Sequence, residues 1–236
     1  MDPQLLTSLN AARRERRAAI LVTGLDDGSH RLVMRGDVAS GDLVSGDLGA
    51  AIGKAFLTGK SGVVEADGAR VFLNVHLPAP RMVIIGAVHI SQALAPMAAM
   101  TGFDVRVIDP RTAFATEDRF AGVDLVADWP EDALRDRPLD AFTALVAVTH
   151  DPKIDDWPLV SALDAGAFYV GALGSRKTHA KRVERLAQAG LSQEQIARIA
   201  APIGLDIGAQ SPEEIAVAIL AQTIAALRKP NHHASA

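Results

Sequence analysis

The amino-acid sequence predicts an α/β protein, with a Rossmann-like, doubly wound parallel sheet preceded by a small α+β domain. Two observations support this fold class. After the proline-rich segment 76–80, short apolar runs alternate with segments of helical periodicity, which is typical of buried parallel strands connected by helices. Before that segment, apolar runs are joined by Asp-Gly turns, which is typical of hairpins. We therefore expect an N-terminal domain at residues 1–78 and a Rossmann-like C-terminal domain at residues 79–236.

The N-terminal domain is expected to begin with a helix over about residues 2–16. Its leucines share one face, and its arginines gather at its end, where they complement the helix dipole. A loop with three Gly-Asp pairs leads into a second helix over about residues 47–57. Turn sequences on either side of this loop and helix predict two hairpins, with strands at 18–23 and 30–35 and at 63–65 and 70–76.

The C-terminal domain is expected to open with a βαβ unit over Arg81–Asp109. The apolar run Met82–Ile85 predicts its first strand, which Gly86 ends, and a helical pattern follows. The second strand, Val105–Ile108, ends at Asp109, 23 residues after Gly86. Further strands are expected at 124–127, 143–148 and 167–171, and further helices at 131–136, 154–164, 175–189, 193–199 and 212–228.

This βαβ unit has the outline of a dinucleotide-binding fingerprint, in which a glycine turn precedes a helix and a later acid meets a ribose hydroxyl. Gly86 and Asp109 fit that outline, but Val88 stands where the second glycine is needed. A branched side chain there would intrude where the backbone should approach a pyrophosphate. We therefore expect weak NAD(P) binding or none, although an NAD(P)-dependent oxidoreductase stays an alternative.

Composition limits the classes of function. The 236 residues are 49% hydrophobic, carry a formal net charge of −4 and contain no cysteine. This balance gives no reason to expect nucleic acid or an anionic membrane as a partner, and the lack of cysteine excludes disulfides and a cysteine nucleophile. No apolar segment is long enough for a signal peptide or a membrane span, so we expect a cytoplasmic protein.

Candidate ligand-binding residues follow the strands of the expected sheet, where ligands bind in doubly wound folds. The glycine-rich segment after the fifth strand is the best anion site, because a capped helix start offers backbone N–H groups beside basic side chains. An ordinary capped helix is the alternative. The candidates are Gly86 and His89, Asp109 and Arg111, His150 and Asp151, and Gly171, Gly174, Ser175, Arg176 and Lys177.

Two other kinds of chemistry could occur at this edge. His150 and Asp151 could act as an acid–base pair or bind a polar ring edge, or Asp151 could cap the helix that starts at Pro152. His89, His150 and His179 lie on separate elements without a paired carboxylate spacing, so we expect no metal site. No G-x-S-x-G hydrolase motif is present, and no catalytic residue is assigned.

Taken together, the motifs of the C-terminal domain resemble those of the xanthine dehydrogenase accessory factors, the XdhC/CoxI family. The resemblance covers nearly all of this domain and depends on several motifs in the same order. They are Gly86-Ala87-Val88-His89, Val107-Ile108-Asp109-Pro110-Arg111, Phe114-Ala115-Thr116 with Arg119-Phe120, Val148-Thr149-His150-Asp151-Pro152-Lys153, Phe168-Tyr169-Val170-Gly171-Ala172-Leu173-Gly174-Ser175-Arg176, and Ala201-Pro202-Ile203-Gly204-Leu205-Asp206-Ile207-Gly208.

The resemblance implies a maturation factor for molybdenum hydroxylases. Such a protein binds the molybdenum cofactor (molybdopterin), protects it while a separate cysteine desulfurase installs the terminal sulfur, and delivers it to the apo molybdenum hydroxylase. It is a cofactor-insertion chaperone rather than an enzyme, and it usually forms a homodimer.

Two positions depart from the family pattern. The family loop is typically Gly-Ala-Gly-His, and Val88 replaces its second glycine. The N-terminal domain of the family usually carries a Ser-Gly-Gly-Cys segment, and the corresponding stretch here is Val44–Gly49, with Asp47 in the place of the cysteine. A third hypothesis therefore is a binding-only paralogue that docks maturation partners without the cofactor.

Overall fold

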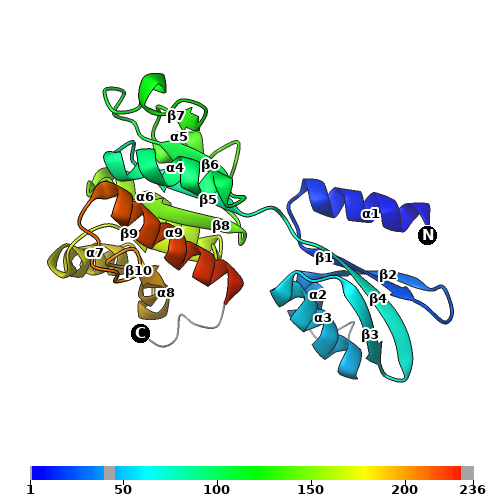
Figure 1. Cartoon of the computed structure of the whole chain (residues 1–236). Coiled ribbons are helices and arrows are strands. Elements are labelled where there is room, and N and C mark those ends of the chain that lie inside the picture. Colours follow the sequence, from blue (N-terminus) through cyan, green and yellow to red (C-terminus); the bar gives the residue numbers. More distant parts are fainter. Residues whose placement is uncertain (1, 40–45, 230–236) are drawn as a thin grey trace. The chain divides into compact units, whose positions relative to one another are not determined.

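The computed structural model describes residues 2–39 and 46–229, and the chain forms two compact units, Met1–Pro78 and Ala79–Ala236. The N-terminal unit holds an antiparallel sheet of strand order β2-β1-β4-β3 together with its helices (Figure 1). Its elements are α1 (Pro3–Arg14), β1 (Ala19–Gly24), β2 (His30–Met34), α2 (Arg35–Ala39), α3 (Gly46–Thr58), β3 (Gly62–Ala66) and β4 (Ala69–His76).

Both expected hairpins of the N-terminal unit are present. Strand β1 pairs with β2, with Ile20 opposite Val33, and β3 pairs with β4. β1 and β4 then join the two hairpins, with Val22 opposite Leu73. The short helix α2 was not expected, because five residues directly after a strand carry too little periodicity to predict a helix.

The C-terminal unit contains a six-stranded parallel sheet of order β10-β9-β8-β5-β6-β7. The chain starts near the middle and winds outward in both directions, so the expected doubly wound α/β fold is confirmed. Its strands are β5 (Arg81–Ile85), β6 (Asp104–Ile108), β7 (Asp124–Val126), β8 (Thr143–Ala147), β9 (Tyr169–Ala172) and β10 (Ile199–Ala200). Its helices are α4 (His89–Met100), η1 (Glu117–Arg119), α5 (Pro130–Ala133), α6 (Pro152–Asp164), α7 (Arg176–Gln188), α8 (Gln193–Ala197) and α9 (Pro212–Arg228).

Helices cover both faces of this sheet, which explains why its central strands are apolar throughout. Alternate residues of a strand point to opposite faces. Met82 and Ile84 of β5 pack in one cluster with residues of α4 and α9, and Val83 and Ile85 pack in another with residues of α6 and α7. Figure 1 shows α4 and α9 side by side over one face. Burying each such side chain contributes on the order of 2 kcal/mol.

The sixth strand was not predicted from the sequence. Residues 193–199 were expected to be helical, but α8 ends at Ala197, and Ile199 and Ala200 pair with Val170 and Gly171 of β9. A two-residue strand has no periodicity of its own. It forms because β9 offers an unpaired edge, which is a tertiary effect.

Candidate functional site

The carboxyl ends of β5 and β8 meet where the strand order reverses, which is the ligand-binding position of doubly wound sheets. Gly86 leaves β5 with φ of +117°, and a Cβ atom there would lie 2.7 Å from Cγ2 of Thr149, the second residue after β8. Only glycine combines that backbone conformation with this close approach. Gly86 therefore brings the two loops into contact at the switch point.

Val88 is accommodated without backbone strain. It is the N-cap of α4, with φ of −102° and ψ of 174°, and no side chain caps this helix start. Its side chain is half-buried against the apolar cluster that includes α4 and α9. His89, the first residue of α4, is exposed, and no hydrogen bond within the described part of the chain joins it to the other candidates.

Asp109 is fully buried, and its carboxylate is already occupied by donors of the chain. Oδ2 accepts a hydrogen bond of 2.7 Å from the N–H of Ala87, and Oδ1 accepts one of 2.9 Å from the N–H of Arg111. The Arg111 guanidinium donates twice more, from Nε at 2.9 Å and from Nη2 at 2.8 Å. The expected contact between Asp109 and a ribose hydroxyl is therefore not the role that this geometry provides. Asp109 ties the β5 loop to the β6 loop and aims Arg111.

The electrostatics of this pair are consistent with a fixed, charged Arg111. Burial alone would raise the pKa of Asp109, but the hydrogen bonds from Arg111 and Ala87 outweigh burial and hold that pKa below its ordinary value. The hydrogen bonds to Asp109 raise the pKa of Arg111, and the negative charges of Asp151 and Asp155 add to this rise. Those two carboxylates follow β8, so Arg111 acts electrostatically across the switch point.

Arg111 also packs on an aromatic ring, since its guanidinium carbon lies 4.7 Å from the centroid of Phe114. The same loop is fastened to α4: Arg119 donates to the side chain of Gln92 at 3.0 Å, and Gln92 donates to the Arg119 carbonyl at 3.2 Å. One third of the Arg111 side chain remains exposed. The β6 loop thus presents a positioned cation beside an exposed aromatic ring.

The loop after β8 is built on a buried carboxylate that the sequence analysis missed, that of Asp155. Oγ1 of Thr149 donates to Asp155 at 2.7 Å, and the N–H of His150 donates to it at 3.1 Å. Burial raises the pKa of Asp155 to about 6, against these hydrogen bonds, which lower it. His150 is exposed and has φ of +66°, a left-handed conformation uncommon for a non-glycine residue.

Asp151 has the structural role that was one of its two alternatives. It is the N-cap of α6, and its carboxylate accepts a hydrogen bond of 3.0 Å from the N–H of Lys153. Burial and the nearby charge of Arg182 lower the pKa of His150. His150 is thus the more available of the two side chains toward the switch point.

The segment after β9 divides into a packing part and a helix start. Gly171 lies inside β9, where a Cβ atom would come within 2.7 Å of Ile203 and of the Tyr169 hydroxyl, so its small size makes room for the core rather than for a ligand. Gly174 has φ of +147°, and Ser175 caps α7 by accepting a hydrogen bond of 3.2 Å from the N–H of Thr178. The expected cap is confirmed.

Basic groups surround this helix start. Arg176 and Lys177 are exposed in the first turn of α7. One turn further along, the buried Arg182 donates from Nη2 to the carbonyl of Leu173 at 3.1 Å. Arg182 was not predicted, because an arginine in a helix as polar as α7 is expected to be solvated. Its burial depends on α6, which lies beside α7.

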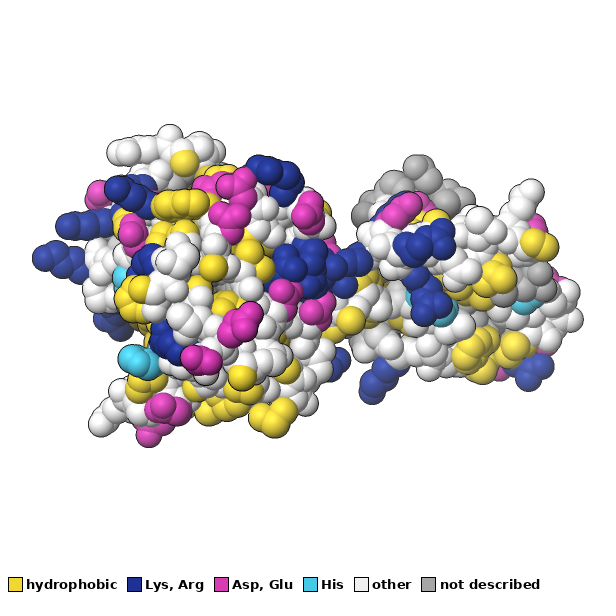
Figure 2. Space-filling model, turned by 90° about the horizontal axis from the view of Figure 1, so that it is seen from above, with side chains coloured by type: hydrophobic (Ala, Val, Ile, Leu, Met, Phe, Trp, Pro, Cys, Tyr) yellow, Lys and Arg dark blue, Asp and Glu magenta, His cyan; other side chains and the backbone are white. Residues whose placement is uncertain are grey.

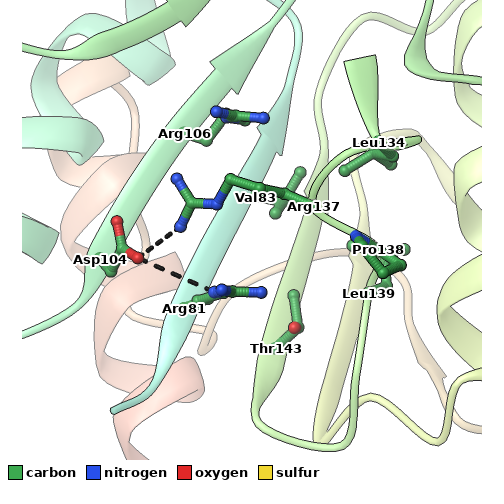
Figure 3. A pocket seen from close by; sticks show the side chains of 9 residues that line it. All are labelled: Arg81, Val83, Asp104, Arg106, Leu134, Arg137, Pro138, Leu139 and Thr143. Carbon is green, nitrogen blue, oxygen red and sulfur yellow. Dashed lines mark hydrogen bonds and ion pairs between the residues drawn. The ribbon is translucent and has the colours of Figure 1, made fainter. Parts of the chain in front are cut away.

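A separate hollow lies at the opposite, amino-terminal edge of the sheet, where β5, β6 and β8 begin (Figure 3). Its charges are paired: Arg137 and Arg81 both approach Asp104, and Arg106 bonds Asp124 at 2.8 Å. This balanced set fastens strands together and offers no surplus charge to a ligand. On the face of the C-terminal unit shown in Figure 2, basic and acidic side chains are interspersed.

The corresponding stretch of the N-terminal unit is described only in part, since Val44 and Ser45 lie outside the described residues, as do His232 and His233. Asp47 lies in the first turn of α3, and its N–H donates to the carboxylate of Asp67 at 3.3 Å. The N–H of Leu48 donates to the same carboxylate at 3.4 Å. The chain's own acid therefore caps this helix start.

Neither a metal centre nor a membrane-spanning helix is present in residues 2–39 and 46–229. No group of three or more His, Asp or Glu side chains in these ranges is arranged to hold a metal ion. No helix in the same ranges is long and apolar enough to cross a bilayer.

Comparison with known proteins relates the C-terminal unit to one family. The family model described as the XdhC Rossmann domain matches residues 82–223. The chain is 34% identical over 155 residues to a probable xanthine dehydrogenase subunit of Bacillus subtilis (strain 168), which covers 65% of this chain and 45% of that protein. It is 31% identical over 145 residues to the molybdenum cofactor insertion chaperone PaoD of Escherichia coli (strain K12), which covers 61% and 39%.

Another relative is the uncharacterized protein YqeB of Escherichia coli (strain K12), 32% identical over 166 residues, which cover 65% of this chain and 28% of YqeB. The chain thus spans less than half the length of these relatives. A crystal structure described as a xanthine dehydrogenase from Bacillus halodurans superposes with a TM-score of 0.64 at 23% identity, over 98% of this chain and 69% of the other. That likeness supports the fold.

Proposed function

The chain belongs to the XdhC family, and from this relationship we propose that it binds the molybdenum cofactor and supports its sulfuration and insertion into a molybdenum hydroxylase of the xanthine dehydrogenase type. The similarity to PaoD, a relative named as a molybdenum cofactor insertion chaperone, carries the proposal. The site supports it, because positioned cations and exposed polar groups follow three neighbouring strands at the switch point. The proposed role is that of a chaperone without a catalytic residue.

The residues at this edge fit a ligand with a planar, polar ring and a phosphate, which the molybdenum cofactor has. The phosphate would bind at Gly174–Lys177, where a capped helix start and two exposed basic side chains favour an anion. The pterin ring would lie toward Arg111, with His89 and His150 able to bond its polar edge. Gly86 shapes the loop, and Asp109 and Asp151 position their neighbours. When bound, the cofactor supplies the molybdenum centre that the client enzyme uses.

The lack of cysteine bears on the proposed partners. This chain has no thiol, so a persulfide sulfur for the cofactor has to come from a separate protein, and we propose a cysteine desulfurase as that partner and an apo molybdenum hydroxylase as the recipient. The family cysteine position holds Asp47, in a helix start that Asp67 caps. We further propose that the protein acts as a homodimer, which sedimentation equilibrium would test.

Purification from a cofactor-producing host tests the central proposal. The expected result is pterin fluorescence and stoichiometric molybdenum in the purified protein, and a higher sulfurated fraction of a co-expressed hydroxylase, measured as cyanide-releasable sulfur. A protein that carries no pterin and leaves that fraction unchanged would refute it. Capture of a hydroxylase or desulfurase by a pterin-free protein would instead support the binding-only alternative.

A double variant, Arg176→Ala with Lys177→Ala, tests the assigned phosphate end. Both side chains are exposed, so we expect weaker cofactor binding with a nearly unchanged melting temperature. Lys181→Ala with Arg228→Ala is the matched control, because it removes two exposed charges away from the helix start. A large stability loss with unchanged binding would make Arg176 and Lys177 structural.

Calorimetry with NAD and NADP tests the remaining alternative, an NAD(P)-dependent oxidoreductase. The fold favours it, but two features of the site oppose it. Val88 stands at the second glycine position, and the carboxylate of Asp109 is buried under its own donors rather than open to a ribose. We expect no binding at millimolar concentrations.

A further inference from the structure

Arg182 is a buried cation with unused hydrogen-bond donors. Its side chain is 2% exposed, and only Nη2 has a partner, the carbonyl of Leu173. Nε and Nη1 are buried and have no hydrogen-bond partner within the described part of the chain. Buried polar groups are normally bonded, and a buried charge needs a counter-charge. Two idle donors on one buried guanidinium therefore call for an explanation.

Asp155 does not provide the missing bonds. Its Oδ2 lies 3.9 Å from Nη2 of Arg182, too far for a hydrogen bond. Both carboxylate oxygens already accept other hydrogen bonds, from Thr149 and from the N–H of His150. The pair is thus an ion pair at long range, and the positive charge of Arg182 is only partly compensated.

The idle side of the guanidinium lies under the start of α7. A Cβ atom at Gly174 would be 3.9 Å from Nη1 of Arg182, so any ligand atom resting on this glycine comes equally close. The first N–H groups of a helix have no acceptor inside it. Ser175 satisfies that of Thr178, which leaves those of Arg176 and Lys177 at the same place. A buried cation and a helix start thus converge on one glycine.

A second side chain in this turn is also unsatisfied. Nδ1 of His179 is buried and has no partner among the described residues. Burial and the nearby charge of Arg182 lower the pKa of His179, as they do that of His150. The guanidinium therefore lies close to both the β8 loop and the β9 loop.

We propose that Arg182, beneath Gly174 and the first turn of α7, is the buried floor of a phosphate-binding site that takes the phosphoryl group of a phosphate or pyrophosphate ligand. The inference rests on the proposed function only for the identity of that ligand as the molybdenum cofactor. The phosphoryl oxygens supply the negative charge that Asp155 supplies at long range. Asp155 therefore competes with the ligand for Arg182.

Binding of inorganic pyrophosphate to the full-length protein tests the site without the cofactor. Arg182→Met removes the charge and keeps an apolar body of similar length, and we expect affinity to fall about 10- to 100-fold, as for the loss of a charged hydrogen bond. Arg185→Met is the matched control. Arg185 lies on the same helix and bonds Asp156 of α6 at 2.6 Å and 3.0 Å, so its loss breaks an ion pair between α6 and α7 and should leave affinity within about twofold.

Asp155→Asn gives a second test with the opposite sign. It removes the competing negative charge while keeping a side chain of the same shape, so we expect pyrophosphate to bind several-fold more tightly than to the wild type. An arginine that only anchored the Leu173 carbonyl would give no such gain. If Arg182→Met does not fold, this variant decides, and unchanged or weaker binding would overturn the proposal.

The outcomes separate this site from the proposed function. Pyrophosphate binding that depends on Arg182, in a protein that never carries pterin, supports the site and removes the molybdenum cofactor as its ligand. Pterin binding that Arg182→Met leaves unchanged keeps the proposed function and overturns the site. No pyrophosphate binding by the wild type overturns the site as well.

Discussion

Replacing Gly86 by alanine should destabilise the C-terminal unit through two separable effects. The first is backbone strain, because φ of +117° is disfavoured for any residue with a Cβ atom and costs about 1–2 kcal/mol. The second is crowding. The new Cβ would lie 2.7 Å from Cγ2 of Thr149, about 1 Å inside an ordinary carbon–carbon contact, and such overpacking costs about 1–3 kcal/mol.

Thr149 cannot turn away cheaply. Its Oγ1 donates to Asp155 at 2.7 Å and accepts from the N–H of Asp151 at 3.0 Å, so a new rotamer would break both bonds. The expected loss for Gly86→Ala is thus about 2–5 kcal/mol, a large part of a typical domain stability of about 5–15 kcal/mol. Gly102→Ala is the control, because Gly102 has φ of +92° with nothing within 4 Å of its Cβ position. It should lose only the strain, about 1–2 kcal/mol.

Thr149→Ser sharpens the test, since it removes Cγ2 and keeps Oγ1. In a double-mutant cycle, serine should restore about 1–2 kcal/mol to Gly86→Ala, but not all of the crowding, because the backbone N of Thr149 remains 3.3 Å away. Urea unfolding followed by tryptophan fluorescence is the assay. Both tryptophans of the chain, Trp129 and Trp157, lie in the C-terminal unit, so the signal reports this unit alone. Equal losses for Gly86→Ala and Gly102→Ala, or no coupling to Thr149→Ser, would refute the reasoning.

Three further predictions concern stability. Burial raises the pKa of Asp155 to about 6 from 3.8, so the folded protein holds this proton more tightly and its free energy of unfolding falls as pH rises from about 4 to about 6; urea titrations should show the difference between wild type and Asp155→Asn falling by up to about 3 kcal/mol over that range, and parallel curves would contradict this. Asp109→Asn leaves the Arg111 guanidinium without its carboxylate and should cost about 3 kcal/mol in the same assay, whereas a neutral result would mean that this pair does not fasten the loops. Ser211→Ala removes the capping box of α9 and should cost about 1 kcal/mol, with no change in pyrophosphate affinity.

The fold could be predicted because the core of the C-terminal unit depends on local patterns. Strands such as β5 and β8 are continuous apolar runs, since helices cover both faces of the sheet. Helix starts such as those at Ser175 and Ser211 depend on residues three apart in the sequence. β10 could not be found in this way, because two residues become a strand only through pairing with β9.

The candidate site was harder to predict, since its chemistry depends on contacts that sequence spacing does not contain. The position of Asp109 was predictable from its spacing after Gly86, but its role was not. Arg111, only two residues further along, turns back and takes both carboxylate oxygens, so the acid of the fingerprint becomes the support of a cation. Its neighbour across the switch point shows the same inversion in the other direction: Arg182 lies on the polar helix α7, yet α6 and the β9 loop bury it. In both places a charge that the sequence shows is redirected by its partner, and the edge of the sheet changes from one suited to a ribose hydroxyl to one suited to an anion.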